Sequence, residues 1–170
     1  MGHSYGGIAI SKAADELPER IARLVCVNAF VPLSGESLNS MVPPHYVGMF
    51  DAIAAAMGGA VMLPFPVWRD AFINDADAAL AQSAFDQLNP QPYKTFTDAI
   101  ALKTELAAMQ LGKSYVNFLA DAALPHSMPW HPRLSERLGL FRYVVGQGSH
   151  ETCFSNPKHL AEKIVEAGRD

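Results

Sequence analysis

Residues 2–7 read Gly2-His3-Ser4-Tyr5-Gly6-Gly7, a Gly-x-Ser-x-Gly pentapeptide followed by one further glycine. This pattern is typical of a tight turn from a strand into a helix, because glycine on either side lets the two elements approach closely. Such a turn exposes the serine hydroxyl and aims the backbone N–H of the next residue at a developing oxyanion. The pentapeptide therefore predicts Ser4 as a nucleophile and Tyr5 as an oxyanion-hole donor.

The residues that follow support this interpretation. Residues 7–17 (GIAISKAADEL) have a helical pattern, with Ile8, Ala9 and Ala13 on one side. A helix that begins directly after the serine is what the turn requires. The alternative is a glycine-rich N-terminal tail that contains a serine by chance.

Three short runs are rich in β-branched and aromatic residues: residues 23–29 (RLVCVNA), 114–119 (SYVNFL) and 141–145 (FRYVV). Their apolar residues are nearly continuous rather than alternating, which favours parallel strands buried on both faces.

Helical patterns lie between and after these runs. One helix is expected around residues 134–138, and a second over residues 156–167, where Asn156 is a plausible N-cap and Pro157 takes the first helical position. Strands alternating with helices predict an α/β fold with a parallel sheet.

A long insertion separates the predicted core, residues 1–34 and 111–170, into two parts. Residues 35–110 are rich in Met and Pro and show helical patterning, as in residues 75–88 (DADAALAQSAFDQL). We interpret this insertion as a mostly helical cap or lid. Most of its Met and Phe side chains are expected to pack in the hydrophobic core, while a minority line an adaptable apolar pocket.

A serine nucleophile needs a base, and His150 is the best placed histidine. It lies in residues 146–151 (GQGSHE), a loop after the third predicted strand and before the last helix. Catalytic groups gather at the carboxyl ends of such strands. The remaining histidines are expected to have packing or surface roles: His3, His45, His126, His131 and His159.

Asp121 is the candidate acid, because it directly follows the second predicted strand. The chain order Ser4, Asp121, His150 is the order expected when such a serine turn, an acid and a base form a triad. Aspartate is also a common turn residue, so a local structural role is the alternative. Glu151 is adjacent to His150 and therefore poorly placed to bond its Nδ1.

The overall composition narrows the function classes. The chain has 170 residues, 49% of them hydrophobic and 18% charged, which is typical of one globular unit. With 13 basic and 17 acidic residues, its formal charge of -4 argues against a nucleic-acid partner. No signal-peptide pattern, membrane-spanning run, metal-ligand spacing or nucleotide fingerprint is recognisable. We therefore expect no cofactor and no metal. Cys26 and Cys153 do not make a disulfide framework, so we expect a cytoplasmic protein.

The chain resembles the plant methylesterase and hydroxynitrile-lyase branch of the α/β-hydrolases, and most of all its bacterial esterase-like relatives. The stretches that carry the resemblance are residues 2–7 (GHSYGG), 25–32 (VCVNAFVP), 35–37 (GES), 121–124 (DAAL) and 148–150 (GSH). The resemblance covers the chain as the C-terminal part of an α/β-hydrolase fold, from the serine turn onward.

The resemblance implies a serine hydrolase that acts on a small apolar carboxylic ester through an acyl-enzyme. Ser4, Asp121 and His150 match the family's triad, and Tyr5 matches the oxyanion donor of its serine turn. The lyases of this branch carry a lysine directly after the catalytic histidine. Glu151 stands there in this sequence, and its charge would repel a cyanide leaving group. Lyase activity is therefore not expected.

The resemblance also predicts missing parts. Because the sequence opens at the serine turn, the strand leading into Ser4, the earlier strands and the second oxyanion donor are expected to be absent. One missing donor typically costs about 100- to 1000-fold in rate. The strand around Val25 to Val27 would lose a neighbour, so self-association through an exposed sheet edge is expected. The alternative function is a truncated, catalytically silent module that associates with itself or a partner.

Overall fold

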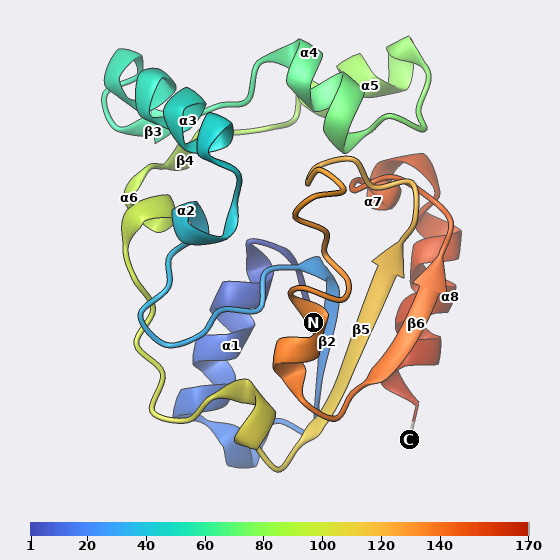
Figure 1. Ribbon diagram of the computed structural model, residues 1–170. Helices are drawn as coiled ribbons and strands as arrows, with labels where there is room; N and C mark the ends of the chain where they lie inside the picture. The colour runs from blue at the N-terminus through green and yellow to red at the C-terminus, as the bar shows by residue number, and fades with distance from the viewer. Residues whose placement is uncertain (170) are drawn as a thin grey trace.

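A four-stranded parallel sheet forms the centre of the chain in the computed structural model, which describes residues 1–169. Its strands are β1 (Gly2–Ser4), β2 (Arg23–Ala29), β5 (Gly112–Phe118) and β6 (Arg142–Gly146), in the order β1-β2-β5-β6. Every pairing is parallel, so the carboxyl ends of the strands meet at one edge, the upper edge in Figure 1. The predicted α/β class with a parallel sheet is confirmed.

The strand leading into Ser4, which we expected to be absent, is present as β1. Gly2 is paired with Cys26, and His3 is paired with Val27. Ser4 is paired with Ala29, after an irregularity in the register between His3 and Ser4. The expectation that β2 loses this neighbour is therefore wrong. Self-association through a sheet edge stays a prediction.

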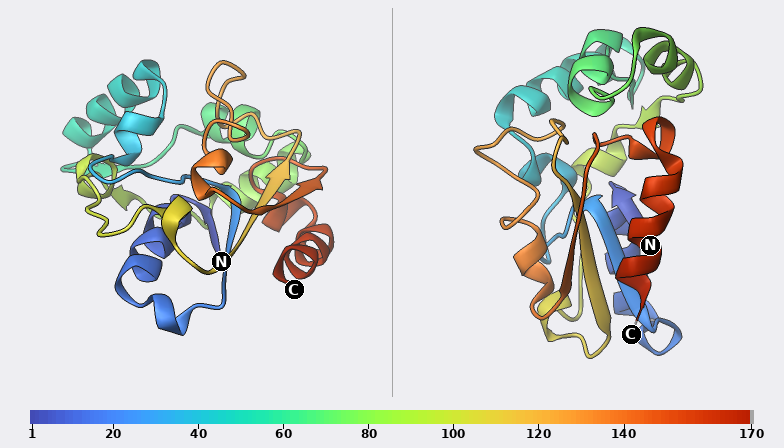
Figure 2. Two further views of the ribbon diagram at one scale, coloured as in Figure 1. Left: turned by 60° about the horizontal axis from the view of Figure 1, so that its bottom comes forward. Right: turned by 90° about the vertical axis from the view of Figure 1, so that its right-hand side faces the viewer.

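Helices cover both faces of the sheet. Helix α1 (Gly6–Glu16) lies on one face and helix α8 (Pro157–Gly168) on the other (Figure 2). Successive side chains of a strand point to opposite faces. In β2, Cys26 belongs to the core on the α1 face, whereas Val25 and Val27 pack with the α8 face. This arrangement explains why the strand sequence is apolar at nearly every position.

The helix expected around residues 134–138 is not an α-helix. Ser135–Leu138 form only a short 3₁₀ turn, η4. Gly139 follows with a positive φ of 73°, which ends the turn after four residues. By contrast, α8 begins as predicted, because the Asn156 side chain accepts a hydrogen bond from the His159 backbone N–H at 3.2 Å.

Of residues 35–110, here called the cap, residues 44–85 lie above the carboxyl ends of the strands, whereas residues 98–110 run down the side of the molecule to the start of β5 (Figure 1). The remaining short elements, most of them in the cap, are η1 (Pro18–Arg20), α2 (Leu38–Met41), α3 (Pro44–Ala56), β3 (Ala60–Val61), α4 (Phe65–Val67), the π-helical η2 (Trp68–Phe72), α5 (Ala78–Phe85), β4 (Gln91–Pro92), α6 (Lys94–Thr97), η3 (Leu106–Ala108) and α7 (Thr152–Ser155). Strands β3 and β4 pair antiparallel in a separate two-stranded sheet.

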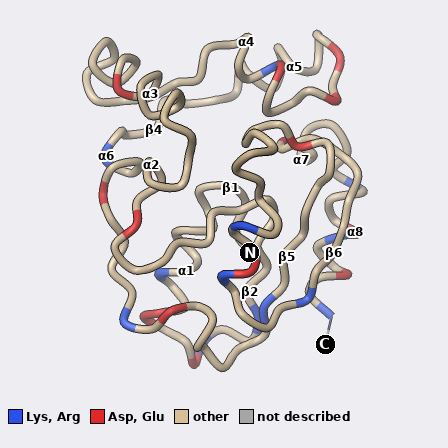
Figure 3. The backbone as a smooth tube through the Cα atoms, in the orientation of Figure 1, with Lys and Arg blue, Asp and Glu red and all other residues tan. Residues whose placement is uncertain are grey.

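The cap has a small hydrophobic cluster of its own. Trp68, Ile73, Ala81 and Ala84 are buried together, and the Trp68 indole N–H donates to the Ala81 carbonyl at 3.2 Å. The cap therefore does not depend only on the main core for its packing. Within residues 1–169, every helix is too short or too polar to cross a bilayer. Basic and acidic residues are interspersed along the backbone (Figure 3).

Candidate active site

Ser4 occupies a strained turn between β1 and α1. Its φ is +52°, a value that non-glycine residues rarely adopt. The glycines around it allow close contacts: a Cβ on Gly2 would lie 2.5 Å from the Gly6 carbonyl oxygen. A Cβ on Gly7 would lie 2.1 Å from the carbonyl oxygen of Phe30. Gly2 and Gly7 are therefore required by the backbone, whereas a Cβ on Gly6, the second glycine of the pentapeptide, would meet nothing within 4 Å, so the requirement expected there is wrong.

Tyr5 stands at the N-terminus of α1 and lines the same cavity as Ser4. Its carbonyl accepts a hydrogen bond from the Ile8 N–H at 2.9 Å, in the first turn of the helix. The N-terminus of a helix carries partial positive charge and unpaired N–H groups. This end of α1 thus offers a favourable environment for an anionic oxygen.

Asp121 and His150 lie against each other below the cap. Nδ1 of His150 is 2.6 Å from Oδ2 of Asp121, and both side chains are 1% exposed. The backbone N–H of Ala123 donates to the other carboxylate oxygen, Oδ1, at 2.8 Å. The carboxylate thereby fixes the imidazole so that Nε2 is left for other partners.

The pKa values of this pair move in opposite directions. Burial tends to lower the pKa of His150, but the charge of Asp121 and the hydrogen bond to it outweigh burial and raise that pKa. Burial tends to raise the pKa of Asp121, but the charge and hydrogen bond of His150 and further hydrogen bonds lower it. Both shifts favour the ion pair that forms when His150 takes up a proton.

Asn28, which was not predicted as a site residue, forms a hydrogen bond with Asp121. Its side-chain N–H donates to Oδ2 of Asp121. Its Oδ1 accepts the backbone N–H of Phe118 at 2.7 Å, so the side chain ties the end of β2 to the end of β5. Asn28 is 1% exposed and has a φ of +34°. A polar residue inside an otherwise apolar strand was the one signal that pointed to it.

Aromatic rings enclose His150. The indole of Trp130 stacks on the imidazole, with ring centroids 5.2 Å apart and planes 12° apart. Phe72 from the cap meets it edge-on at 5.3 Å, and the His3 ring lies 4.4 Å away. The pKa of His3 is lowered to about 3, mainly by burial and to a smaller extent by the charge of the neighbouring His150. His3 is therefore neutral over the pH range in which His150 titrates.

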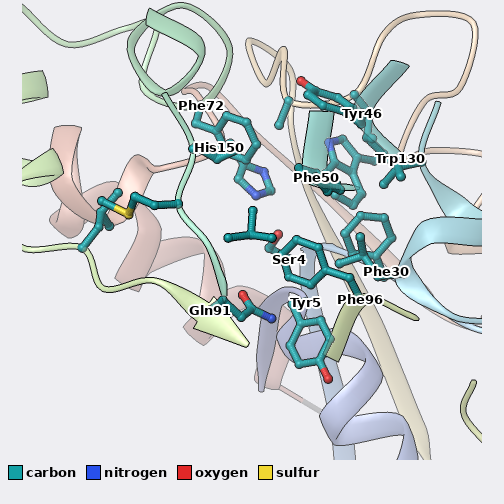
Figure 4. Close-up of a pocket in the computed structure, with 18 of the residues that line it drawn as sticks. Ser4, Tyr5, Phe30, Tyr46, Phe50, Phe72, Gln91, Phe96, Trp130 and His150 are labelled. Carbon is teal, nitrogen blue, oxygen red and sulfur yellow. The ribbon is translucent and has the colours of Figure 1, made fainter. Parts of the chain in front are cut away.

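A cavity of about 190 Å³ opens between the sheet and the cap, and both Ser4 and His150 line it (Figure 4). Its wall is mostly aromatic and aliphatic: Phe30, Tyr46, Phe50, Phe72, Phe96, Trp130, Leu38, Val42, Val61, Met62, Leu63 and Leu88. Asn89 and Gln91 add two amides to this wall. Because cap residues supply most of these side chains, the cap determines the shape of the cavity.

The structure thus brings four predicted site residues to one place. Ser4, Tyr5 and His150 line the cavity, and Asp121 lies behind His150. Within residues 1–169, no direct hydrogen bond joins the Ser4 hydroxyl to His150. Such contacts commonly tighten only when substrate is bound.

Metal-ligating side chains gather at one point of the described residues. Ligand atoms of His3, His150 and Glu151 all lie within 4.8 Å of one another. Two imidazoles and one carboxylate form a donor set that suits zinc. The absence of a metal, expected from the sequence, stays a prediction.

No family model matches the chain. Among solved structures, an extracellular α/β-hydrolase from a Paenibacillus species is 38% identical, with a TM-score of 0.95, and the match covers 99% of this chain and 71% of that one. The chain belongs to the α/β-hydrolase superfamily. The Paenibacillus hydrolase is described as sharing structural and functional homology with tobacco salicylic acid binding protein 2.

Two further comparisons agree with this membership. A carbendazim-hydrolysing esterase of Nocardioides sp. is 29% identical to this hydrolase over 176 residues, which cover 99% of this chain and 70% of that protein. The methylesterase MES16 from Arabidopsis, at 18% identity and a TM-score of 0.73, shares the fold, with coverage of 98% and 66%. The resemblance to the methylesterase branch is confirmed, and its named relatives support ester hydrolysis by this hydrolase.

Proposed function

We propose that this hydrolase cleaves a small, largely apolar carboxylic ester through an acyl-enzyme. Ser4 is the nucleophile, His150 the general base and acid, and Asp121 the group that orients the imidazole. The observation that carries the proposal is the buried 2.6 Å contact between Asp121 and His150 at the wall of the cavity that also contains Ser4.

The steps follow from these positions. His150 Nε2 removes the hydroxyl proton of Ser4 as Oγ attacks the ester carbonyl, which produces a tetrahedral oxyanion. The Tyr5 N–H donates to that oxygen. The intermediate collapses to an acyl-Ser4, and the protonated His150 gives its proton to the leaving alcohol. Water, activated by the same imidazole, then releases the carboxylic acid and restores Ser4.

The substrate class follows from the walls of the cavity. A volume of about 190 Å³ bounded by aromatic rings suits a compact apolar acyl or alkoxy group. The residues that line the cavity include neither Lys nor Arg to neutralise a charged substrate. Glu151 beside His150 disfavours an anionic leaving group such as cyanide, so ester hydrolysis is preferred to lyase chemistry.

Hydrolysis of p-nitrophenyl acetate and butyrate by the full chain tests the proposal. We expect turnover that falls at least about 1000-fold in the Ser4→Ala variant, because the acyl-enzyme can no longer form. Ser83→Ala, an exposed serine on α5, is the matched control and should retain full activity. Full activity of the Ser4→Ala variant would refute the proposal. A chain without any esterase activity would favour the silent module.

The cytoplasmic location inferred from the sequence stays a prediction, and the Paenibacillus relative is described as extracellular.

A further inference from the structure

A short segment of the cap is bonded to both loops that carry the proposed base and acid. This clasp segment, residues 72–75, runs from the end of η2 to the turn before α5. We propose that Asp75 is a positioning residue for His150, so that the cap holds the base in place as well as shaping the cavity. This inference rests on the proposed function of His150.

The clasp segment bonds to the backbone on both sides of His150. The Ser149 N–H donates to Oδ2 of Asp75 at 2.9 Å. The Glu151 N–H donates to the carbonyl oxygen of Phe72 at 3.0 Å. The residues directly before and after the base, Ser149 and Glu151, therefore each donate a backbone N–H to the cap, and these bonds restrain the loop that carries the imidazole.

The clasp segment also reaches the loop that carries Asp121. Asn74 donates its side-chain N–H to the carbonyl oxygen of Ala120, the residue before the acid, at 3.0 Å. The Ala120 N–H in turn donates to the carbonyl of Gly148 at 3.1 Å. Two adjacent cap residues thus hold the residues that precede the proposed acid and base.

The clasp segment is itself firmly anchored. Ile73 is completely buried in the cap's small cluster with Trp68. The ring of Phe72 packs edge-on against the His150 imidazole. The Ser155 hydroxyl at the end of α7 adds a second hydrogen bond to Asp75 Oδ2, at 2.9 Å. In Figures 1 and 2, α5 of the cap lies directly above α7, consistent with this connection.

The two ends of the Ser149–Asp75 bond differ in exposure. Asp75 is exposed, so its substitution leaves the main core intact. Ser149 is 0% exposed, and its N–H depends on a protein acceptor. Removal of the carboxylate therefore leaves a buried donor unpaired. The loop has to shift to bring that donor to water, and His150 shifts with it.

Asp75→Ala, Asp75→Asn and Asp77→Ala separate positioning from general stability. Because a small displacement of a catalytic group strongly lowers the rate, we expect Asp75→Ala to reduce kcat for p-nitrophenyl butyrate about 10-fold or more with KM within about twofold. Asp75→Asn retains an oxygen acceptor, so its kcat should stay within about threefold of the wild type. Asp77 caps α5 through the Leu80 N–H at 2.8 Å, and its loss should lower Tm without lowering kcat.

Hydrogen exchange at the Ser149 amide supplies a readout that does not need hydrolysis. Exchange should accelerate at least about tenfold in Asp75→Ala and stay near the wild-type rate in Asp77→Ala. Unchanged exchange and unchanged kcat in Asp75→Ala would overturn the inference. Equal kcat losses in the Asn and Ala variants would also overturn it, because they would indicate a charge effect. Accelerated exchange in a chain without esterase activity would support the clasp and refute only the proposed function.

Discussion

Replacing Asn28 by glycine should destabilise this hydrolase and impair its base at the same time. The glycine adopts the observed φ of +34° without strain, so the effect comes from the lost side chain. That side chain accepts the Phe118 N–H at 2.7 Å and donates to Asp121. Asn28 and Phe118 are 1% and 2% exposed, so water does not replace these bonds without rearrangement.

The expected magnitude follows from these two bonds. An unpaired buried N–H costs about 1–3 kcal/mol, and a lost hydrogen bond to a carboxylate about 1.5–3 kcal/mol. Glycine in a strand adds about 0.5–1 kcal/mol through backbone entropy. We therefore expect the free energy of unfolding to fall by about 3–7 kcal/mol for Asn28→Gly, a large part of the stability of a typical domain.

Urea unfolding at pH 7 measures this loss, and Asn28→Asp serves as the matched variant. The new carboxyl still accepts the Phe118 N–H but no longer donates to Asp121 when it is ionised. Like charge and burial raise the pKa of this carboxyl, so its stabilising contribution is present at low pH and is lost as the pH rises through that raised pKa. A loss below about 1 kcal/mol for Asn28→Gly would refute this role of Asn28.

Three other predictions concern pH and packing. Because the pKa of His150 is raised, kcat/KM for a p-nitrophenyl ester should increase with pH through an apparent pKa above 6.5. A profile that is flat from pH 5 to 9 would contradict the role of His150 as base. The pKa of His3 is lowered to about 3, so below pH 6.5 the unfolded chain binds a proton that the folded chain does not. The free energy of unfolding should therefore decline as the pH falls from 6.5 towards 3. Urea unfolding at pH 5 and 7 should show a smaller decline for His3→Gln. Gly7→Ala places a Cβ 2.1 Å from the Phe30 carbonyl and should destabilise by about 3 kcal/mol or more in thermal melts, whereas Gly48→Ala, with open space on α3, should be neutral or stabilising.

The strands were predictable where local sequence determines them. Residues 23–29 matched β2, because burial on both faces requires continuous apolar side chains. The next strand begins at Gly112 rather than Ser114, because Lys113 is buried there with its Nζ bonded to the carbonyl of Leu106 at 2.8 Å. Lysine is seldom buried, so its side chain gave no sign that this strand begins before Ser114.

In the candidate site, too, residues with a local sequence pattern were predictable and residues without one were not. Ser4, Asp121 and His150 could be proposed from the sequence because a serine turn and polar residues after strands have local signatures. Asn28 is marked only as a polar residue within an apolar strand, and Asp75 has no local signature. Their partners lie 90 and 74 residues away, and the sequence alone does not tell which loop will meet which. The residues that orient the proposed triad were therefore less predictable than its members.

The central claim is that Ser4 is a nucleophile activated by His150. Labelling with a fluorophosphonate, followed by tryptic digestion and fragmentation of the peptide that ends at Lys12, tests it directly. The account predicts a single phosphonyl adduct on Ser4, formed at least about 100-fold more slowly in the His150→Ala variant. An adduct on Ser11 or elsewhere, or a labelling rate that His150→Ala leaves unchanged, would contradict it.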